Sequence, residues 1–199
     1  MTEWELFAAL CRIVGGRDER AFTACADARC LPTLLQLTDR LDLLPALASR
    51  ALQLVTAIEL PPAQRERLQQ ALLENTGRNM QVIAQARKLA LLLNSRGIAP
   101  LFIKGTAQLL DPDRAEHTGF RKQLDIDLVI AEPELTVAAR ALLDDGYQFY
   151  HADGQRPIPE LDQALHLGRY HHHLPPLGKP GYACMVELHR HHLPRRFQR

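Results

Sequence analysis

The sequence predicts an α+β protein of the α/β type, in which an N-terminal helical region (residues 1–96) precedes a mixed β-sheet flanked by helices (residues 97–199). Before Gly97, apolar residues recur every three or four positions, as in amphipathic helices. After Gly97, short apolar runs typical of strands alternate with helical segments. The chain has 199 residues, 46% of them hydrophobic, which is enough for a substantial core.

The first region is expected to be entirely helical. Residues 3 to about 58 predict two or three helices, because the apolar spacing continues on both sides of Pro32. Pro61 and Pro62 end one helix and open a longer one, and Gly97 is its expected stop. The apolar stripe of this longer helix consists of Leu68, Leu72, Met80, Ile83, Ala86, Ala90 and Leu93.

The second region mixes strands and helices. "IAPLFIKG" predicts a short strand, "TAQLLD" a brief helix and "KQLDIDLVI" a second strand. "EPELTVAARALLDDG" predicts a helix that ends at Gly146, and "YQFYH" predicts the strand after it. Two further strands, at about 168–174 and 182–191, are expected to form a hairpin across a Pro/Gly-rich connection. The chain ends abruptly in "LPRRFQR", which would fit a core truncated at its C-terminus.

Charge and composition narrow the classes of function. Twenty-four Lys and Arg against 23 Asp and Glu give a formal charge of +1, so the sequence has no strong nucleic-acid signal and no field that attracts an anionic membrane. The start lacks signal-peptide features, and no run approaches the roughly 18 apolar residues of a membrane span, so we expect a cytoplasmic protein. The four cysteines show no CxxC spacing and are expected to be reduced.

Two aspartates interrupt the strand "RKQLDIDLVI". Period-two alternation puts Asp125 and Asp127 on one face, with their Cα atoms roughly 6.6 Å apart. This face could simply be solvated, as in many antiparallel sheets, or the two carboxylates could converge on cations. The stretch by itself leaves both interpretations open. The residues expected on the opposite, inward face are Leu124, Ile126, Leu128 and Ile130.

Two other motifs contain groups of similar chemistry. In "FIKGTAQLL" a strand ends at Gly105 where a helix begins, and such a junction offers backbone N–H groups to phosphate beside the cation of Lys104. A tight turn that needs glycine explains this motif equally well. In "CMVELHRHH", Glu187 shares a strand face with His189 and His191, although an isolated glutamate is more often a rim charge.

Taken together, these motifs predict a site for metal and phosphate. Three carboxylates on neighbouring strands, beside a glycine turn, would suit two hard divalent cations and a triphosphate. Like charges at this spacing repel one another without a cation, and Mg²⁺ (or Mn²⁺) would remove that repulsion.

The order of the motifs resembles a known family. "IKGTAQLL", "RKQLDIDLVI" with Arg121 four residues before Asp125, "LLDDGY" and "VELHRHH" are similar to the uncharacterised bacterial nucleotidyltransferase-like family of the DNA polymerase β superfamily. The similarity covers about residues 97 to 192, and a preceding helical half is usual in that family. It implies a nucleotidyltransferase-like sheet and transfer of a nucleoside monophosphate from an NTP, by default ATP, to an unidentified acceptor hydroxyl.

The resemblance also implies roles for individual residues. Thr106 departs from the Ser or Gly more usual after the glycine, and its β-branch crowds the turn. Lys104 and Arg121 match motif positions, and their charge indicates phosphate contact. The carried-over sets are Asp125, Asp127 and Glu187 as catalytic metal ligands, and Lys104, Gly105, Thr106 and Arg121 for the nucleotide.

The histidines support two further hypotheses. Six of the nine lie between His171 and His192. His189 and His191, with Glu187 and either His171 or His173, could form a transition-metal site. The simpler hypothesis is that His189 and His191 support the site by orienting Glu187 or the acceptor.

Two alternatives to the enzyme therefore stay open. One is a catalytically inactive domain of the same fold that binds nucleotide or protein. The other is a protein that binds a transition metal through its histidine cluster.

Overall fold

The computed structural model describes residues 1–16, 19–27, 29–54, 60–169 and 171–190. Its contacts divide the chain into two compact units, the first formed by Met1–Asn79 with Glu116–Lys122 and the second by Met80–Ala115 with Gln123–Arg199. Helix α5 (Pro62–Asn94) contributes to both units. Among the described residues, no helix is both long and apolar enough to cross a membrane.

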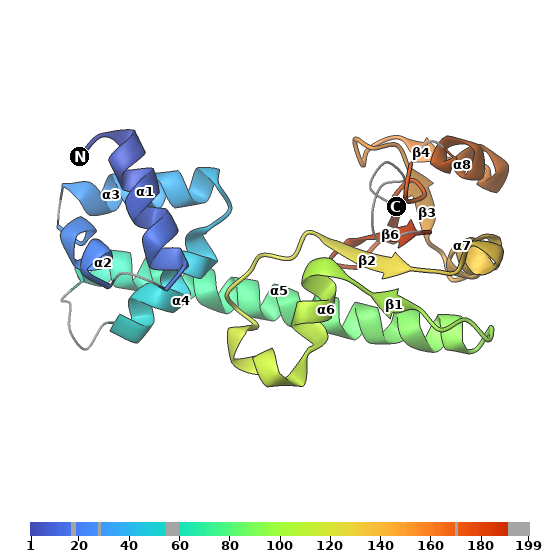
Figure 1. The fold of residues 1–199 in the computed structure, drawn as a ribbon, viewed down its shortest axis with the longest axis horizontal. Helices are drawn as coiled ribbons and strands as arrows, with labels where there is room; N and C mark the ends of the chain where they lie inside the picture. Colours follow the sequence, from blue (N-terminus) through green and yellow to red (C-terminus); the bar gives the residue numbers. More distant parts are fainter. Residues whose placement is uncertain (17–18, 28, 55–59, 170, 191–199) are drawn as a thin grey trace, which may run out of the picture. The chain divides into compact units, whose positions relative to one another are not determined.

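The first unit is helical, and its described residues form four helices before α5 where the sequence predicts two or three (Figure 1). Residues with a left-handed backbone follow two of these helices, Gly16 (φ 67°) after the first and Asp42 (φ 55°) after the third, and a helix cannot continue through such a residue. A capping box starts the first helix, because Thr2 and Glu5 each accept a hydrogen bond from the other's backbone N–H. The helices are α1 (Glu3–Val14), α2 (Glu19–Cys25), α3 (Cys30–Arg40) and α4 (Leu44–Leu54).

A later segment of the chain, residues 116–122, also belongs to the first unit. The Asn75 side-chain amide donates to the Gly119 carbonyl at 2.7 Å, and the Asn79 amide donates to the carbonyls of Thr118 (2.6 Å) and Arg121 (2.7 Å). A Cβ at Gly119 would lie 2.4 Å from a hydroxyl of α5, so only glycine permits this close approach. The segment that leads into the aspartate strand is thus bound to α5.

The second unit contains an open mixed sheet of six strands, in the order β1-β2-β6-β5-β3-β4. Among these strands, β2 and β6 pair in parallel and the other neighbours pair antiparallel. This arrangement confirms the predicted α+β class. The strands are β1 (Leu101–Phe102), β2 (Asp125–Val129), β3 (Gln148–Tyr150), β4 (Pro157–Ile158), β5 (Leu177–Gly178) and β6 (Met185–His189). The helical elements are α6 (Lys104–Leu110), α7 (Leu135–Asp144) and α8 (Leu161–Gly168), with 3₁₀ turns η1 (Pro112–His117) and η2 (Glu132–Glu134).

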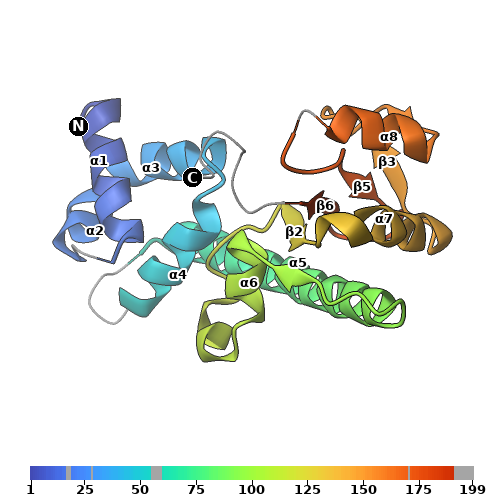
Figure 2. The same ribbon diagram turned by 45° about the vertical axis from the view of Figure 1, so that its right-hand side comes forward.

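One face of β2 and β6 is packed into the core. Ile126 and Leu128 of β2 join Val186 and Leu188 of β6 in one buried cluster with apolar residues of α7 and the C-terminal part of α5. Figures 1 and 2 show these two helices beside the strands. Leu124, expected on the inward face, is instead 57% exposed, because it precedes the first paired residue of β2. The opposite face of both strands carries the polar side chains.

The end of the chain differs from the predicted hairpin. The expected strand at 168–174 is wrong, since Gly168 ends α8 and, among the described residues of this stretch, only His173 makes a bridge, with His189. The antiparallel partner of β6 is β5, paired at Leu177 and Val186. The apolar residues Leu161, Ala164 and Leu165 have helical spacing, which is the signal for α8.

Candidate active site

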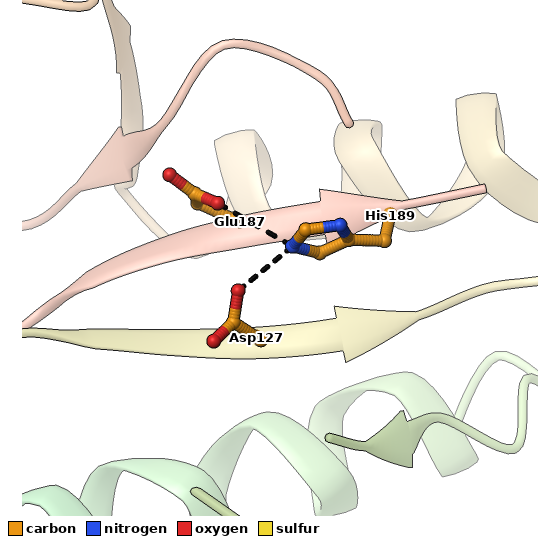
Figure 3. A group of neighbouring side chains, drawn as sticks. All are labelled: Asp127, Glu187 and His189. Carbon is orange, nitrogen blue, oxygen red and sulfur yellow. Dashed lines mark hydrogen bonds and ion pairs between the residues drawn. The ribbon is translucent and has the colours of Figure 1, made fainter. Parts of the chain in front are cut away.

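The register between β2 and β6 brings together carboxylates from distant parts of the chain. Asp127 pairs with Glu187 and Asp125 with Met185 in the parallel ladder. Paired residues of neighbouring strands point to the same face, and residues two apart on one strand also share a face. Asp125, Asp127, Glu187 and His189 therefore lie on one side of the sheet, and Figure 3 shows three of them converging.

Asp127 is at the centre of this group. Its side chain is fully buried, and its Oδ1 accepts hydrogen bonds from Lys104 Nζ (2.7 Å) and His189 Nε2 (2.8 Å). Burial raises the pKa of Asp127, but the hydrogen bonds from His189 and Lys104 outweigh it and hold the pKa below its ordinary value. Its Oδ2 is buried and has no partner. An unpaired buried carboxylate oxygen is costly unless a ligand completes it.

His189 joins two carboxylates. Its Nε2 lies between Asp127 Oδ1 and Glu187 Oε2, which is 3.3 Å away (Figure 3). Burial lowers the pKa of His189, yet the hydrogen bonds to Asp127 and Glu187 raise it above its ordinary value overall. The same contact holds the pKa of Glu187 below its usual range, against the effect of burial. His189 therefore compensates part of the negative charge on this face.

Asp125 lies at the margin of the group and is only partly buried. Burial raises its pKa, and the charges of Asp127 and Glu187 raise it further. Among the described residues, one group of three potential metal ligands occurs, formed by Asp127, Glu187 and His189, with ligand atoms within 4.8 Å of one another. Oxygen ligands of this kind suit Mg²⁺ or Mn²⁺, and the imidazole is better suited to Mn²⁺.

The junction of β1 and α6 lies beside the aspartates. The Ile103 N–H donates to the Asp127 carbonyl at 3.1 Å, and the buried Thr106 hydroxyl lies 3.5 Å from the Asp125 carbonyl. Gly105 between them is also buried. The left-handed backbone conformation falls on Lys104, with φ 54°, a conformation that costs a non-glycine residue roughly 1–2 kcal/mol.

Gln123 is a site residue that the sequence did not indicate. It is 3% exposed, its side-chain amide donates to the Asp125 carbonyl, and the amide nitrogen also lies 3.4 Å from Thr106 Oγ1. Gln123 links the aspartate strand to the start of α6. Its position two residues before Asp125 was the available signal, because alternation puts it on the same face.

Other residues expected at the site are not part of this group. Arg121 belongs to the first unit, and its phosphate contact stays a prediction. His191 lies outside the described residues. The rings of His172 and His173 lie with their centroids 5.2 Å from that of His189, but neither histidine belongs to the three-ligand group.

Comparison with known proteins gives one match. No curated protein and no solved structure is similar enough to count as a match. Residues 28–199 match a family described as uncharacterised nucleotidyltransferase. This range covers most of the chain and contains all the residues of the carboxylate group and the β1–α6 junction. The chain therefore belongs to the uncharacterised nucleotidyltransferase family.

Proposed function

We propose that this protein transfers a nucleoside monophosphate from an NTP, with ATP as the default donor, to an acceptor hydroxyl, with pyrophosphate as the leaving group. Asp125, Asp127 and Glu187 would hold two divalent cations, Mg²⁺ or Mn²⁺. The observation that supports this most strongly is the buried, unpartnered Oδ2 of Asp127 within a group of ligand atoms. When bound, the cations would neutralise phosphate charge and activate the acceptor hydroxyl.

The chain's other residues have supporting tasks in this proposal. His189 orients the carboxylates of Asp127 and Glu187 through its Nε2. Gln123 holds the backbone of Asp125. Lys104, Gly105 and Thr106, at the start of α6, would contact the triphosphate, as would Arg121.

The first prediction concerns transfer itself. Wild-type protein, incubated with α-labelled ATP, Mg²⁺ or Mn²⁺ and a cell extract, is expected to label an acceptor. The variant Asp125→Asn plus Asp127→Asn should lose label transfer by more than about a hundredfold, because even outer partners of metal ligands contribute 10–100-fold. Asp145→Asn is a suitable control, since this carboxylate forms a surface pair with Lys179 at 2.8 Å.

Other results would favour the alternatives. If the folded wild type transfers no label but ATP with Mn²⁺ raises its melting temperature, the protein is an inactive binding domain of this fold. If chelators lower the melting temperature and Mg²⁺ with ATP has no effect, the transition-metal hypothesis replaces the proposed enzyme.

A further inference from the structure

Lys104 neutralises a buried carboxylate from a partly solvated position. Its Nζ lies 2.7 Å from Asp127 Oδ1, yet its side chain is 47% exposed while that of Asp127 is 1% exposed. A long side chain that reaches in from solvent can leave its partner by rotation about its own bonds. Because Asp127 is buried, loss of the ammonium without replacement would leave an uncompensated charge, so the contact is exchanged readily only when another cation takes its place.

The two cations on Asp127 differ in their freedom to leave. His189 is 0% exposed and lies on the central strand β6, where it also contacts Glu187. Lys104 is the first residue of α6, directly after the N-cap Ile103. A cation that binds Asp127 must overcome the positive charge already there, and Lys104 is the charge that can move away.

The position of Lys104 also brings its ammonium near a second expected partner, the triphosphate. It directly precedes Gly105 and Thr106, where the triphosphate is expected to bind. Its left-handed backbone conformation (φ 54°) is strained, and a strained conformation persists only where the surrounding structure fixes the backbone. The ammonium is therefore attached to the start of α6, beside both Asp127 and the expected phosphates.

We propose that Lys104 is an exchangeable cation, which occupies Asp127 when no metal is bound and moves to the triphosphate when metal and nucleotide bind together. This inference rests on the proposed function, because it assumes the same metal and nucleotide site. Its consequence is positive coupling: Lys104 opposes binding of metal by itself, whereas the triphosphate provides a new partner for the displaced ammonium.

The test measures Mn²⁺ binding by calorimetry, with and without a non-hydrolysable ATP analogue. Lys104→Met, which keeps the length of the side chain and removes its charge, is expected to bind Mn²⁺ alone about three- to tenfold more tightly than wild type. The analogue should also raise the Mn²⁺ affinity of Lys104→Met by a factor that is several-fold smaller than the factor for wild type. Lys104→Arg should keep the wild-type pattern.

Lys179→Met is the matched control, because Lys179 pairs with Asp145 on the surface of the same unit. It should change neither Mn²⁺ affinity nor coupling, and thermal unfolding checks that each variant is folded. Unchanged or weaker Mn²⁺ binding by Lys104→Met would overturn the exchange, even if label transfer is observed. The expected exchange without any label transfer would support it and contradict the proposed reaction. If neither wild type nor Lys104→Met binds Mn²⁺, both proposals fail.

Discussion

At the scale of single residues, the pair of Asp127 and His189 dominates the electrostatics of the site. Both side chains are fully buried, and their atoms Oδ1 and Nε2 are 2.8 Å apart. Folding lowers the pKa of Asp127 below its ordinary value of 3.8 and raises that of His189 above 6.5. Each group is therefore stabilised in its charged form.

These opposite shifts predict how the pair's contribution to stability depends on pH. The contribution of His189 is complete below pH 6.5 and is lost as pH rises through its higher folded-state pKa. The contribution of Asp127 is complete above pH 3.8 and is lost as pH falls through its lower folded-state pKa. In metal-free buffer, His189→Gln should therefore reduce the free energy of unfolding most near pH 5, by about 1–2 kcal/mol.

Urea unfolding of both proteins from pH 5 to pH 9 measures this difference. It should shrink as pH rises through the raised folded-state pKa of His189, because wild-type His189 then becomes neutral. A difference that stays constant across this range would show that the loss is one of packing, not of charge. Asp162→Asn, which removes an exposed carboxylate of α8, should give a small difference throughout.

At the scale of the elements, glycines end the helices where the sequence expects them. Gly97 follows α5 with φ 75°, and Gly146 follows α7 with φ 89°. A Cβ at Gly146 would meet its nearest atom, Lys179 Cε, at 3.8 Å, so space does not exclude a side chain there. Backbone conformation alone requires glycine at this position.

Gly146→Ala is accordingly expected to destabilise the protein by about 1 kcal/mol. Gly77→Ala is the matched change, because Gly77 lies exposed in the middle of α5 with no atom within 4 Å of an added Cβ. This second variant should stabilise the protein by about 0.5–1 kcal/mol. Chemical denaturation of both variants tests the pair, and destabilisation by both would contradict the conformational explanation.

Local patterns predicted the elements unequally. The long helix, the aspartate strand and α7 follow from periodicity and end signals within a few residues. The strand expected at 168–174 failed because "GRYHHHL" has no strong local preference, and its bridge through His173 depends on the position of β6. The strand β4 and the helix α8 were not predicted, and β4 has only two residues.

At the scale of the whole molecule, the chain builds two separate apolar cores. Leu34 is buried in the first, which also includes Phe22 and Leu68, and Leu89 is buried in the second, with Ile126. Helix α5 contributes residues to both cores. The one tryptophan, Trp4, lies in the first unit, where it is exposed and stacks on Phe7, and the described tyrosines lie in the second, so each unit has its own aromatic probe.

Leu34→Ala leaves a cavity in the first core. It should therefore lower the free energy of the unfolding transition reported by Trp4 by about 2–5 kcal/mol. The transition reported by tyrosine absorbance should change by less than about 0.5 kcal/mol, and Leu89→Ala should give the reverse pattern. Urea unfolding followed with both probes makes the comparison. If each variant shifts both transitions equally, the two cores unfold as one cooperative unit.

The sequence by itself determined which chemical groups share a strand face, since side-chain alternation is a property of the local backbone. Asp125 with Asp127, and Glu187 with His189, could be paired in this way. Only the tertiary structure decided that β2 lies parallel to β6 with Asp127 opposite Glu187, and that Lys104 and His189 both reach Asp127. Strand register and side-chain contacts of this kind depend on the packing of α5 and α7 against the other face of the sheet, and such packing joins residues too distant in sequence for a local pattern to specify.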